Sequence, residues 1–314
     1  MLARLAACKA SEPYEVVVID NACEPPLTAA ALETPGLRAL RILREMQRGK
    51  PYALNHALDE GGLGEVIAVI DDDMSPAADW IQSVLSATRR LPQFDIFSGK
   101  SYVVWPAGVA KPSWAGEPLA QGMLFSTFDT GSSADVEFGK GAARFPSSNC
   151  YWYRRSLLDR GARYPHADLI YEAQFLLRLI SLGHRGVFVP EVVIGHRIQK
   201  ELVSPRFFQD RARLFGRELA EFDMSLAARQ RRGVLARIRI RLRPLRALAE
   251  LGMWSVAWLL AALRSGKKRL PARARALMGI AHCKARLSPS PPEVRIAESS
   301  HKRASRFGPK EPAR

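Results

Sequence analysis

The most constraining feature of the chain is the stretch 64–73, in which the apolar run 66–70 ends in three adjacent carboxylates, Asp71, Asp72 and Asp73. Residues 66–70 are β-branched or small and show no polar alternation, which is typical of a strand buried on both faces in a mostly parallel α/β sheet. Ligands of such sheets bind at the carboxyl ends of the strands, where the chain leaves the sheet. The run therefore predicts a buried strand whose end carries a polar site.

Three neighbouring carboxylates repel one another, so a cation among them would stabilise the cluster. Mg²⁺ or Mn²⁺ binds a few carboxylate oxygens and fills its other positions with water and substrate phosphates. The alternative is a solvated acidic turn, in which Asp73 or Ser75 caps a helix that begins at Pro76. The triple Asp by itself does not decide between a metal site and a helix cap.

Strand-like and helix-like segments alternate over the first 200 residues, which favours a doubly wound α/β layer. The pattern predicts helices over 2–10, 28–33, 50–60, 77–89 and 168–182, and strands over 14–21, 38–43, 65–70, 94–98, 145–155, 187–190 and 192–197. Residues 105–146 are rich in Gly, Pro, Ser and Trp with little periodicity. A loop of that length indicates a lid or a substrate-binding insert.

The positive charge is confined to the last third of the chain. Residues 1–196 carry 19 Lys and Arg against 22 Asp and Glu, and residues 197–314 carry 28 against 9, so the net charges are −3 and +19. The excess positive charge therefore bears on which partners the C-terminal part binds, and not on the fold of the first two thirds of the chain. The four cysteines lie far apart without a Cys-x-x-Cys pair, which indicates a reduced, cytoplasmic protein without a structural metal.

Four polar elements follow one another along the chain. They are Asp20-Asn21 at the end of the strand predicted over 14–21, Gly49-Lys50 with Asn55, the carboxylates Asp71 to Asp73, and Tyr171-Glu172. This order and spacing resemble the family 2 glycosyltransferases of the GT-A fold over roughly residues 2–220. The resemblance implies a GT-A-like layer with a mixed, mostly parallel sheet.

The resemblance also implies roles at these positions. Asp71 and Asp73 match the outer residues of the D-x-D motif that holds a divalent cation, Mg²⁺ or Mn²⁺, on the diphosphate of a nucleotide-sugar donor. Asp20 and Asn21 match the acidic position that contacts the base and ribose, although a plain strand-end turn, taken by itself, is the commoner explanation for such a pair. Two further residues, Lys50 and Asn55, match the loop against the nucleotide.

Glu172 matches the general base that deprotonates the acceptor hydroxyl in an inverting displacement. Here Tyr171 replaces the first acid of the family's acidic pair, and Glu replaces the commoner Asp. The alternative is an acid of the first helical turn, favoured by the helix dipole, with Asp168 as the cap. A capping box would need its acid at 171, so the sequence favours a function for Glu172.

Two basic residues end the strand at 192–197. The position of His196 resembles the one where related enzymes contact the metal or the leaving phosphates, although a lone His is more often structural. Arg197 is a second candidate for neutralising the departing diphosphate. The family normally opens with a further strand and a Pro-Thr-Tyr-Asn-like turn, and we expect either that the start lies upstream of Met1 or that the chain lacks this strand.

The sequence predicts three regions: a GT-A-like domain over 1–225, a basic amphipathic helical region over 226–287, and a disordered basic tail over 288–314. Residues 236–243 fit a strand or a helix, and we favour a helix because the neighbouring segments are helical. The apolar segment 247–263 contains Trp254 and Trp258 and has basic flanks, which suits an anionic membrane surface with the Trp rings near the headgroups.

At 17 residues the segment 247–263 is short for a membrane span, and Glu250 opposes crossing, so we expect it to lie on the bilayer. The alternative is that it packs on the catalytic domain. We therefore expect a cytoplasmic protein that is peripheral on the inner face of the cell membrane.

The expected function is inverting transfer of a sugar from a nucleotide-diphosphate donor to a saccharide or lipid-linked acceptor, in surface polysaccharide or glycolipid synthesis. One alternative is a non-catalytic protein that binds anionic lipid or nucleic acid, although the tail lacks the aromatic and basic pattern of nucleic-acid binding, so we expect no nucleic-acid partner. The other is a nucleotidyltransferase, which can share the α/β layer and the paired Asp residues.

Overall fold

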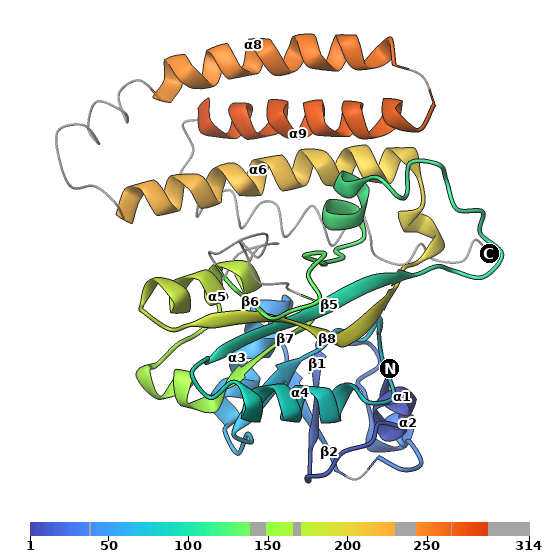
Figure 1. Ribbon diagram of the computed structural model, residues 1–314, viewed down its shortest axis with the longest axis vertical. Helices are drawn as coiled ribbons and strands as arrows, with labels where there is room; N and C mark the ends of the chain where they lie inside the picture. Colours follow the sequence, from blue (N-terminus) through green and yellow to red (C-terminus); the bar gives the residue numbers. More distant parts are fainter. Residues whose placement is uncertain (38, 139–148, 166–170, 230–242, 265, 288–314) are drawn as a thin grey trace. The chain divides into compact units, whose positions relative to one another are not determined.

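The computed structural model describes residues 1–37, 39–138, 149–165, 171–229, 243–264 and 266–287 (Figure 1). Contacts within the chain divide it into two compact units. The first unit consists of Met1–His166 and Tyr171–Ser204, and the second contains the helices from Pro205 onward. Each unit is described by itself.

The first unit is built on a mixed sheet. Its strands follow the order β3 (Val66–Val69), β7 (Tyr151–Arg154), β5 (Ile96–Val104), β8 (Gly186–Arg197) and β4 (Met74–Pro76), and β6 (Val136–Glu137) pairs with β8. The β5 and β8 strands are parallel, and the other neighbours are antiparallel, so β3, β5 and β8 run in the same direction. A separate parallel pair is formed by β1 (Val16–Asn21) and β2 (Leu40–Glu45). The predicted α/β class with a mixed sheet is confirmed.

Helices connect these strands much as the sequence pattern predicts. The first unit contains α1 (Leu2–Ala6), α2 (Ala29–Leu32), α3 (Lys50–Glu60), α4 (Trp80–Arg90) and α5 (Tyr171–Ser181), and the shorter turns η1 (Ala120–Leu124), η2 (Arg155–Arg160) and η3 (Lys200–Leu202). The α3 helix begins after Gly49, whose φ of +132° is accessible to glycine, and ends at Gly61, whose φ is +76°. Two glycines thus fix where this helix starts and stops.

The core of the first unit joins the sheet to α4. Trp152 of β7 stacks on Phe97 of β5 with ring centroids 5.3 Å apart, and its indole Nε1 donates to the Thr88 hydroxyl of α4 at 2.9 Å. All three side chains are buried, so the polar end of the indole is satisfied inside the core.

One alternative interpretation and one prediction around the sheet were wrong. Met74–Pro76 forms the strand β4, paired with β8, so neither Asp73 nor Ser75 caps a helix at Pro76, and α4 begins only at Trp80. The predicted strands 187–190 and 192–197 form the single strand β8. A register shift opposite Gly99 and Lys100 lets the chain pass Pro190, which has no N–H to donate, without ending the strand.

The second unit contains α6 (Pro205–Arg229), α8 (Arg243–Ala262), the turn η4 (Gly266–Lys268) and α9 (Arg269–Leu287). Within this unit α9 lies between α6 and α8 and packs on both (Figure 1). Gly216 of α6 touches α9 so closely that a Cβ would lie 2.0 Å from the Met278 carbonyl oxygen. The predicted helical C-terminal region is present, whereas 236–242 and the predicted tail 288–314 lie outside the described residues.

Gly99→Ala should destabilise the first unit. A Cβ at this position would lie 2.3 Å from the Val192 carbonyl oxygen and 2.7 Å from the Cys150 sulfur, so the β5–β8 pair would have to separate. Overpacking of this kind typically costs about 1–3 kcal/mol in the free energy of unfolding. Gly122→Ala, where a Cβ meets nothing within 4 Å, is the control. Equal urea midpoints for the two variants would contradict the described packing.

Candidate active site

The carboxylates Asp71 to Asp73 form the link between β3 and β4. The pairing of β4 with β8 places Met74 opposite His196. This register brings the His196 ring against Asp73, the residue before Met74, with 3.2 Å between Nε2 of His196 and Oδ2 of Asp73. A strand pairing between residues more than 120 positions apart therefore builds the contact.

Both nitrogens of His196 face acceptors. Nδ1 lies 2.6 Å from the carbonyl oxygen of Phe125, and Nε2 faces the Asp73 carboxylate. A ring whose two nitrogens both donate is an imidazolium. Burial by itself lowers the pKa of His196, but the hydrogen bonds to Asp73 and to the Phe125 carbonyl, together with the nearby carboxylate charges, outweigh burial and raise it. The contact with His196 lowers the pKa of Asp73, although burial acts in the opposite direction. When protonated, His196 places a positive charge beside the carboxylates.

Arg197 also holds the same turn. Its backbone N–H donates to the Asp73 carbonyl oxygen at 2.9 Å, and its guanidinium donates to the carbonyl oxygens of Asp72 and Asp73 at 2.8 and 3.3 Å. These bonds fix the backbone of the acidic turn. The Arg197 side chain is otherwise exposed, so its charge stays at the surface of the site.

Lys50, the first residue of α3, lies between two carboxylates. Its ammonium forms ion pairs with Oδ1 of Asp71 and with Oε1 of Glu172, the latter at 2.5 Å. Burial disfavours the charged ammonium, but the charges of Glu172 and Asp71 outweigh burial and raise the pKa of Lys50. The sequence placed Lys50 against a nucleotide; the structure shows that it joins the acidic turn to α5.

Glu172 lies in the first turn of α5 and is only 5% exposed. Burial raises the pKa of its carboxyl group to about 7, even though the ion pair with Lys50 acts to lower it. A carboxylate with a pKa near neutrality can accept a proton at physiological pH more effectively than an ordinary Glu. The group has the properties of a general base.

An aromatic brace keeps α3 and α5 in position. Asn55 of α3 donates to the Tyr164 carbonyl oxygen at 3.0 Å and accepts from the Tyr164 N–H at 2.8 Å. The Tyr164 ring stacks on Phe175 of α5 with centroids 4.1 Å apart, and its hydroxyl meets those of Tyr151 and Tyr153. Lys50 and Glu172 lie on the two helices that this brace connects. Asn55 therefore supports the site by holding the backbone, and a nucleotide contact by its side chain stays a prediction.

Asp20 and Asn21 are also engaged with the fold. Asp20 is 1% exposed and accepts from the N–H groups of Cys23 and Leu27 and from the Arg44 guanidinium, at 2.8, 3.0 and 2.6 Å. The backbone bond from Cys23 is the main cause that lowers the pKa of Asp20. Asn21 accepts from the Gly49 N–H at 2.7 Å, next to Lys50. Contacts of Asp20 and Asn21 with a nucleotide remain predictions.

The acidic turn has oxygen atoms that suit a hard cation. Oδ1 of Asp73 is buried and has no hydrogen-bond partner in the described part of the chain. A buried, unpaired carboxylate oxygen is costly unless a cation or donor satisfies it. Carboxylate oxygens are the ligands that Mg²⁺ and Mn²⁺ prefer. Asp73, with Asp71 beside it, therefore fits the predicted divalent cation.

A pocket of about 540 Å³ lies elsewhere on α3, lined by Glu45, Tyr52, Asn55, His56, Asp59, Glu60, Arg163 and Tyr164. It contains three acidic side chains and none of the carboxylates Asp71 to Asp73 or Glu172. An acidic lining repels a diphosphate. The pocket is therefore a poor place for the phosphates of a nucleotide-sugar.

Several residues of the site carried no usable sequence signal. The carbonyl oxygen of Phe125, which fixes the His196 ring, can belong to any residue type. Tyr164 is one of many aromatic residues, and its place in the brace depends on contacts with distant segments. The ion pair between Lys50 and Glu172 joins residues 122 positions apart. Only the folded chain reveals these partners.

Comparison with known proteins identifies a family. The model of the family described as "Glycosyl transferase family 2" matches residues 2–160, just over half of the chain, which confirms the resemblance seen in the sequence. No curated protein matches the chain.

Comparison with solved structures returns matches at low sequence identity, including the following three. GalNAc-T7 with UDP, GalNAc and Mn²⁺ is 15% identical with a TM-score of 0.41, and the match covers 63% of this chain and 41% of the GalNAc-T7 chain. The mannosyltransferase PcManGT from Pyrobaculum calidifontis, in complex with GDP-Man and Mn²⁺, is 20% identical with a TM-score of 0.38, and the match covers 93% of this chain and 72% of the PcManGT chain. S. aureus TarS 1-349 is 18% identical with a TM-score of 0.42, and the match covers 90% of this chain and 85% of the TarS chain. The family assignment rests on the family model, because all three TM-scores are below 0.5.

Asn55→Ala should lower the stability of the first unit by about 1–3 kcal/mol, because it removes two hydrogen bonds and leaves the backbone of Tyr164 unpaired. Glu60→Ala is the control, since Glu60 is exposed at the end of the same helix. Urea unfolding measures both. If Asn55→Ala unfolds at the same urea concentration as Glu60→Ala, the brace does not hold α3.

Proposed function

Because the chain belongs to glycosyl transferase family 2, we propose that it transfers a sugar from a nucleoside diphosphate sugar to an acceptor hydroxyl, with inversion at the anomeric carbon. The observation that carries this proposal is the position of Glu172. It is a buried carboxyl group with a pKa raised to about 7, and Lys50 links it to the acidic turn. A proton acceptor beside a diphosphate-binding turn is what such a displacement needs.

The displacement forms one bond and breaks one. The acceptor oxygen bonds to the anomeric carbon from one face of the sugar, and the bond from that carbon to the β-phosphate oxygen breaks on the other face. Glu172 takes the acceptor proton, and the nucleoside diphosphate leaves with the bonding electrons. A single displacement of this kind inverts the anomeric configuration.

Asp71 and Asp73 would hold the divalent cation, which when bound supplies positive charge to the diphosphate as it leaves. The protein's own positive charges lie nearby: the His196 imidazolium contacts Asp73, and the Arg197 guanidinium caps the turn. Both would stabilise the charge that develops on the leaving group.

Lys50 has a separate role in the proposal. A buried carboxyl group tends to stay protonated, and a protonated Glu172 could not accept the proton of the acceptor. The ammonium of Lys50 opposes that tendency by favouring the ionised form of Glu172. Lys50 also orients the carboxylate toward the acidic turn through its second ion pair, with Asp71.

We further propose that the acceptor is a saccharide or a lipid-linked saccharide, used in the synthesis of surface polysaccharide or glycolipid on the cytoplasmic side of the cell membrane. The support is the exposed apolar face of α8, which would keep the enzyme near a membrane-anchored acceptor.

Glu172→Gln should lower turnover by about 10²–10⁴, because general-base assistance is lost, while binding of the nucleotide-sugar persists. Release of nucleoside diphosphate, from a panel of nucleotide-sugars with a lipid extract as the acceptor, measures turnover. The control is Glu65→Gln, the same change at an exposed position just before β3. Equal turnover in the wild type and Glu172→Gln would remove Glu172 as the base.

The pH dependence tests the role of Lys50. The base is active when ionised, so turnover should be present above pH 7 and fall as the pH drops through about 7, the pKa of Glu172. Lys50→Met removes a charge that lowers this pKa, so the acid limb should move to higher pH by about one unit or more.

Lys100→Met is the matched control, because Lys100 forms its ion pair with Asp129, away from the acidic turn. Its acid limb should coincide with that of the wild type. An acid limb in Lys50→Met that stays in place, or moves to lower pH, would contradict the proposed role.

A further inference from the structure

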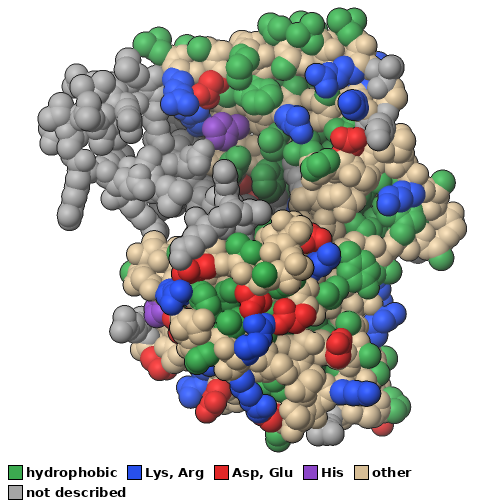
Figure 2. Space-filling model, viewed as in Figure 1, with side chains coloured by type: hydrophobic (Ala, Val, Ile, Leu, Met, Phe, Trp, Pro, Cys, Tyr) green, Lys and Arg blue, Asp and Glu red, His purple; other side chains and the backbone are tan. Residues whose placement is uncertain are grey.

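Helix α8 carries a continuous apolar face that the described residues leave uncovered. Seven large apolar side chains on α8 and in the turn after it are 54–82% exposed: Leu245, Leu248, Met253, Val256, Leu259, Leu260 and Leu263. Four of the six successive intervals are three residues, and all seven positions fall on one side of a helix with about 3.6 residues per turn. Figure 2, in the same view as Figure 1, shows hydrophobic side chains gathered along the top of the picture, where α8 lies. A soluble helix rarely exposes such a row without a partner.

The opposite side of α8 packs on α9. Ala247 and Ala261 are buried there, and the Trp254 ring covers Gly279 so closely that a Cβ on Gly279 would lie 2.3 Å from it. Trp258 stacks under the Arg273 guanidinium, 5.3 Å from its centre. The two Trp rings thus join the helices, which differs from the expectation that they lie near lipid headgroups.

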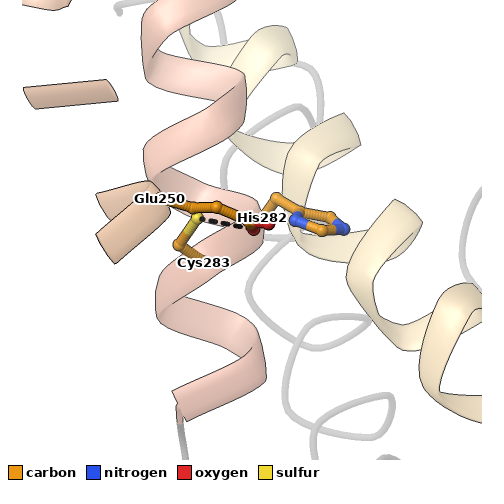
Figure 3. A group of neighbouring side chains, drawn as sticks. All are labelled: Glu250, His282 and Cys283. Carbon is orange, nitrogen blue, oxygen red and sulfur yellow. Dashed lines mark hydrogen bonds between the residues drawn. The ribbon is translucent and has the colours of Figure 1, made fainter. Parts of the chain in front are cut away.

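Glu250 also faces α9. Its carboxylate accepts from Arg246 on its own helix and from Arg286 of α9, both at 2.7 Å. Figure 3 shows Glu250 directed toward His282 and Cys283, whose ligand atoms lie within 4.8 Å of one another and of the carboxylate. Because two guanidiniums already neutralise Glu250, this cluster ties α8 to α9 and is a poor cation site.

The pairing with α9 decides how α8 can meet a bilayer. Leu245–Ala262 has the length and hydropathy of a membrane-spanning helix, judged by composition alone, with a mean hydropathy of 1.3. Crossing would draw α9 into the hydrocarbon with it, and α9 has exposed Arg275 and Lys284 on its surface. Charged side chains in the hydrocarbon are costly. The helix pair therefore suits the membrane interface, with only the outer face of α8 in contact with lipid.

We propose that the outer face of α8 docks on the surface of a bilayer that contains anionic lipid. The charge of the region fits this partner, because residues 197–314 carry 28 basic and 9 acidic side chains. Arg264 and Lys268 are exposed in the turn that follows the apolar face, and Arg269 is exposed at the start of α9. There they can reach lipid phosphates while Leu259, Leu260 and Leu263 insert.

A second copy of the chain is a poorer occupant of this face. Two copies that met through α8 would bring their basic turns and their net charges of +19 into the same region. Like charges at an interface oppose association, whereas anionic headgroups neutralise them. Charge complementarity therefore favours lipid over self-association.

Co-sedimentation of the full-length chain with vesicles tests the proposal. The vesicles are phosphatidylcholine alone, or phosphatidylcholine with about one third phosphatidylglycerol. Leu259→Glu introduces a charge in the middle of the apolar face. Leu182→Glu is the matched control, because Leu182 is 65% exposed in the first unit and Leu259 is 61% exposed. Circular dichroism verifies that both variants are folded.

We expect the wild type and Leu182→Glu to bind the anionic vesicles equally well, and Leu259→Glu to bind about tenfold more weakly or worse. Binding should weaken when NaCl is raised from about 0.1 to about 0.5 M, since salt screens the basic turn. Failure of the wild type to bind anionic vesicles, or equal binding by Leu259→Glu, would overturn the proposal.

Analytical ultracentrifugation without lipid tests whether a second copy of the chain covers the apolar face of α8. The proposal expects the wild type and Leu259→Glu to sediment alike. A wild-type dimer that Leu259→Glu converts to a monomer would show that a second copy covers the face, and would overturn the proposal in favour of self-association. None of these measurements depends on catalysis, so they can fail while the proposed glycosyl transfer stands.

Discussion

The candidate site depends on one buried positive charge, the ammonium of Lys50. Asp71 and Glu172 belong to different elements, and without a cation between them their charges would repel. Lys50 pairs with both and is itself fixed by the start of α3 after Gly49, which Asn21 holds through a hydrogen bond. The same ammonium keeps a buried carboxyl group able to ionise. The position of α3 thus controls both the geometry and the protonation of the site.

The second half of the site depends on strand pairing. The short strand β4 follows the acidic turn immediately, so its pairing with β8 fixes Asp73 against His196 and Arg197. His196 and Arg197 supply positive charge on one side of the turn, and Lys50 supplies it on the other. One oxygen of Asp73 remains buried and unpaired among the described residues, which fits the proposed cation. This unpaired oxygen is the structural feature of the turn that supports the proposal of a bound cation.

Much of the fold could be predicted from local sequence patterns, whereas the contacts between residues distant in the sequence could not. The apolar runs before Asp20 and Asp71 identified β1 and β3, and the glycines around 49 and 61 bounded α3. The expectation that the strand before Asp71 is buried on both faces was wrong, because β3 lies at the edge of the sheet and its residues are half-buried or exposed. The pattern failed at Met74–Pro76, where Pro76 suggested a helix, because pairing with distant β8 overrides local preference. It also could not show that Asn55 binds the backbone of Tyr164, since a side chain's partner depends on the tertiary fold.

The central claim is that the acidic turn binds a nucleotide through a divalent cation, and calorimetry tests it most directly. The full-length chain is titrated with a panel of nucleoside diphosphates, in Mn²⁺ and then in EDTA, and compared with Asp73→Asn and Asp72→Asn. Asp72 is the exposed neighbour and the matched control. The account predicts that one nucleotide binds in Mn²⁺ only, that Asp73→Asn abolishes binding, and that Asp72→Asn retains it. Binding that persists in EDTA, or equal binding by both variants, would contradict it.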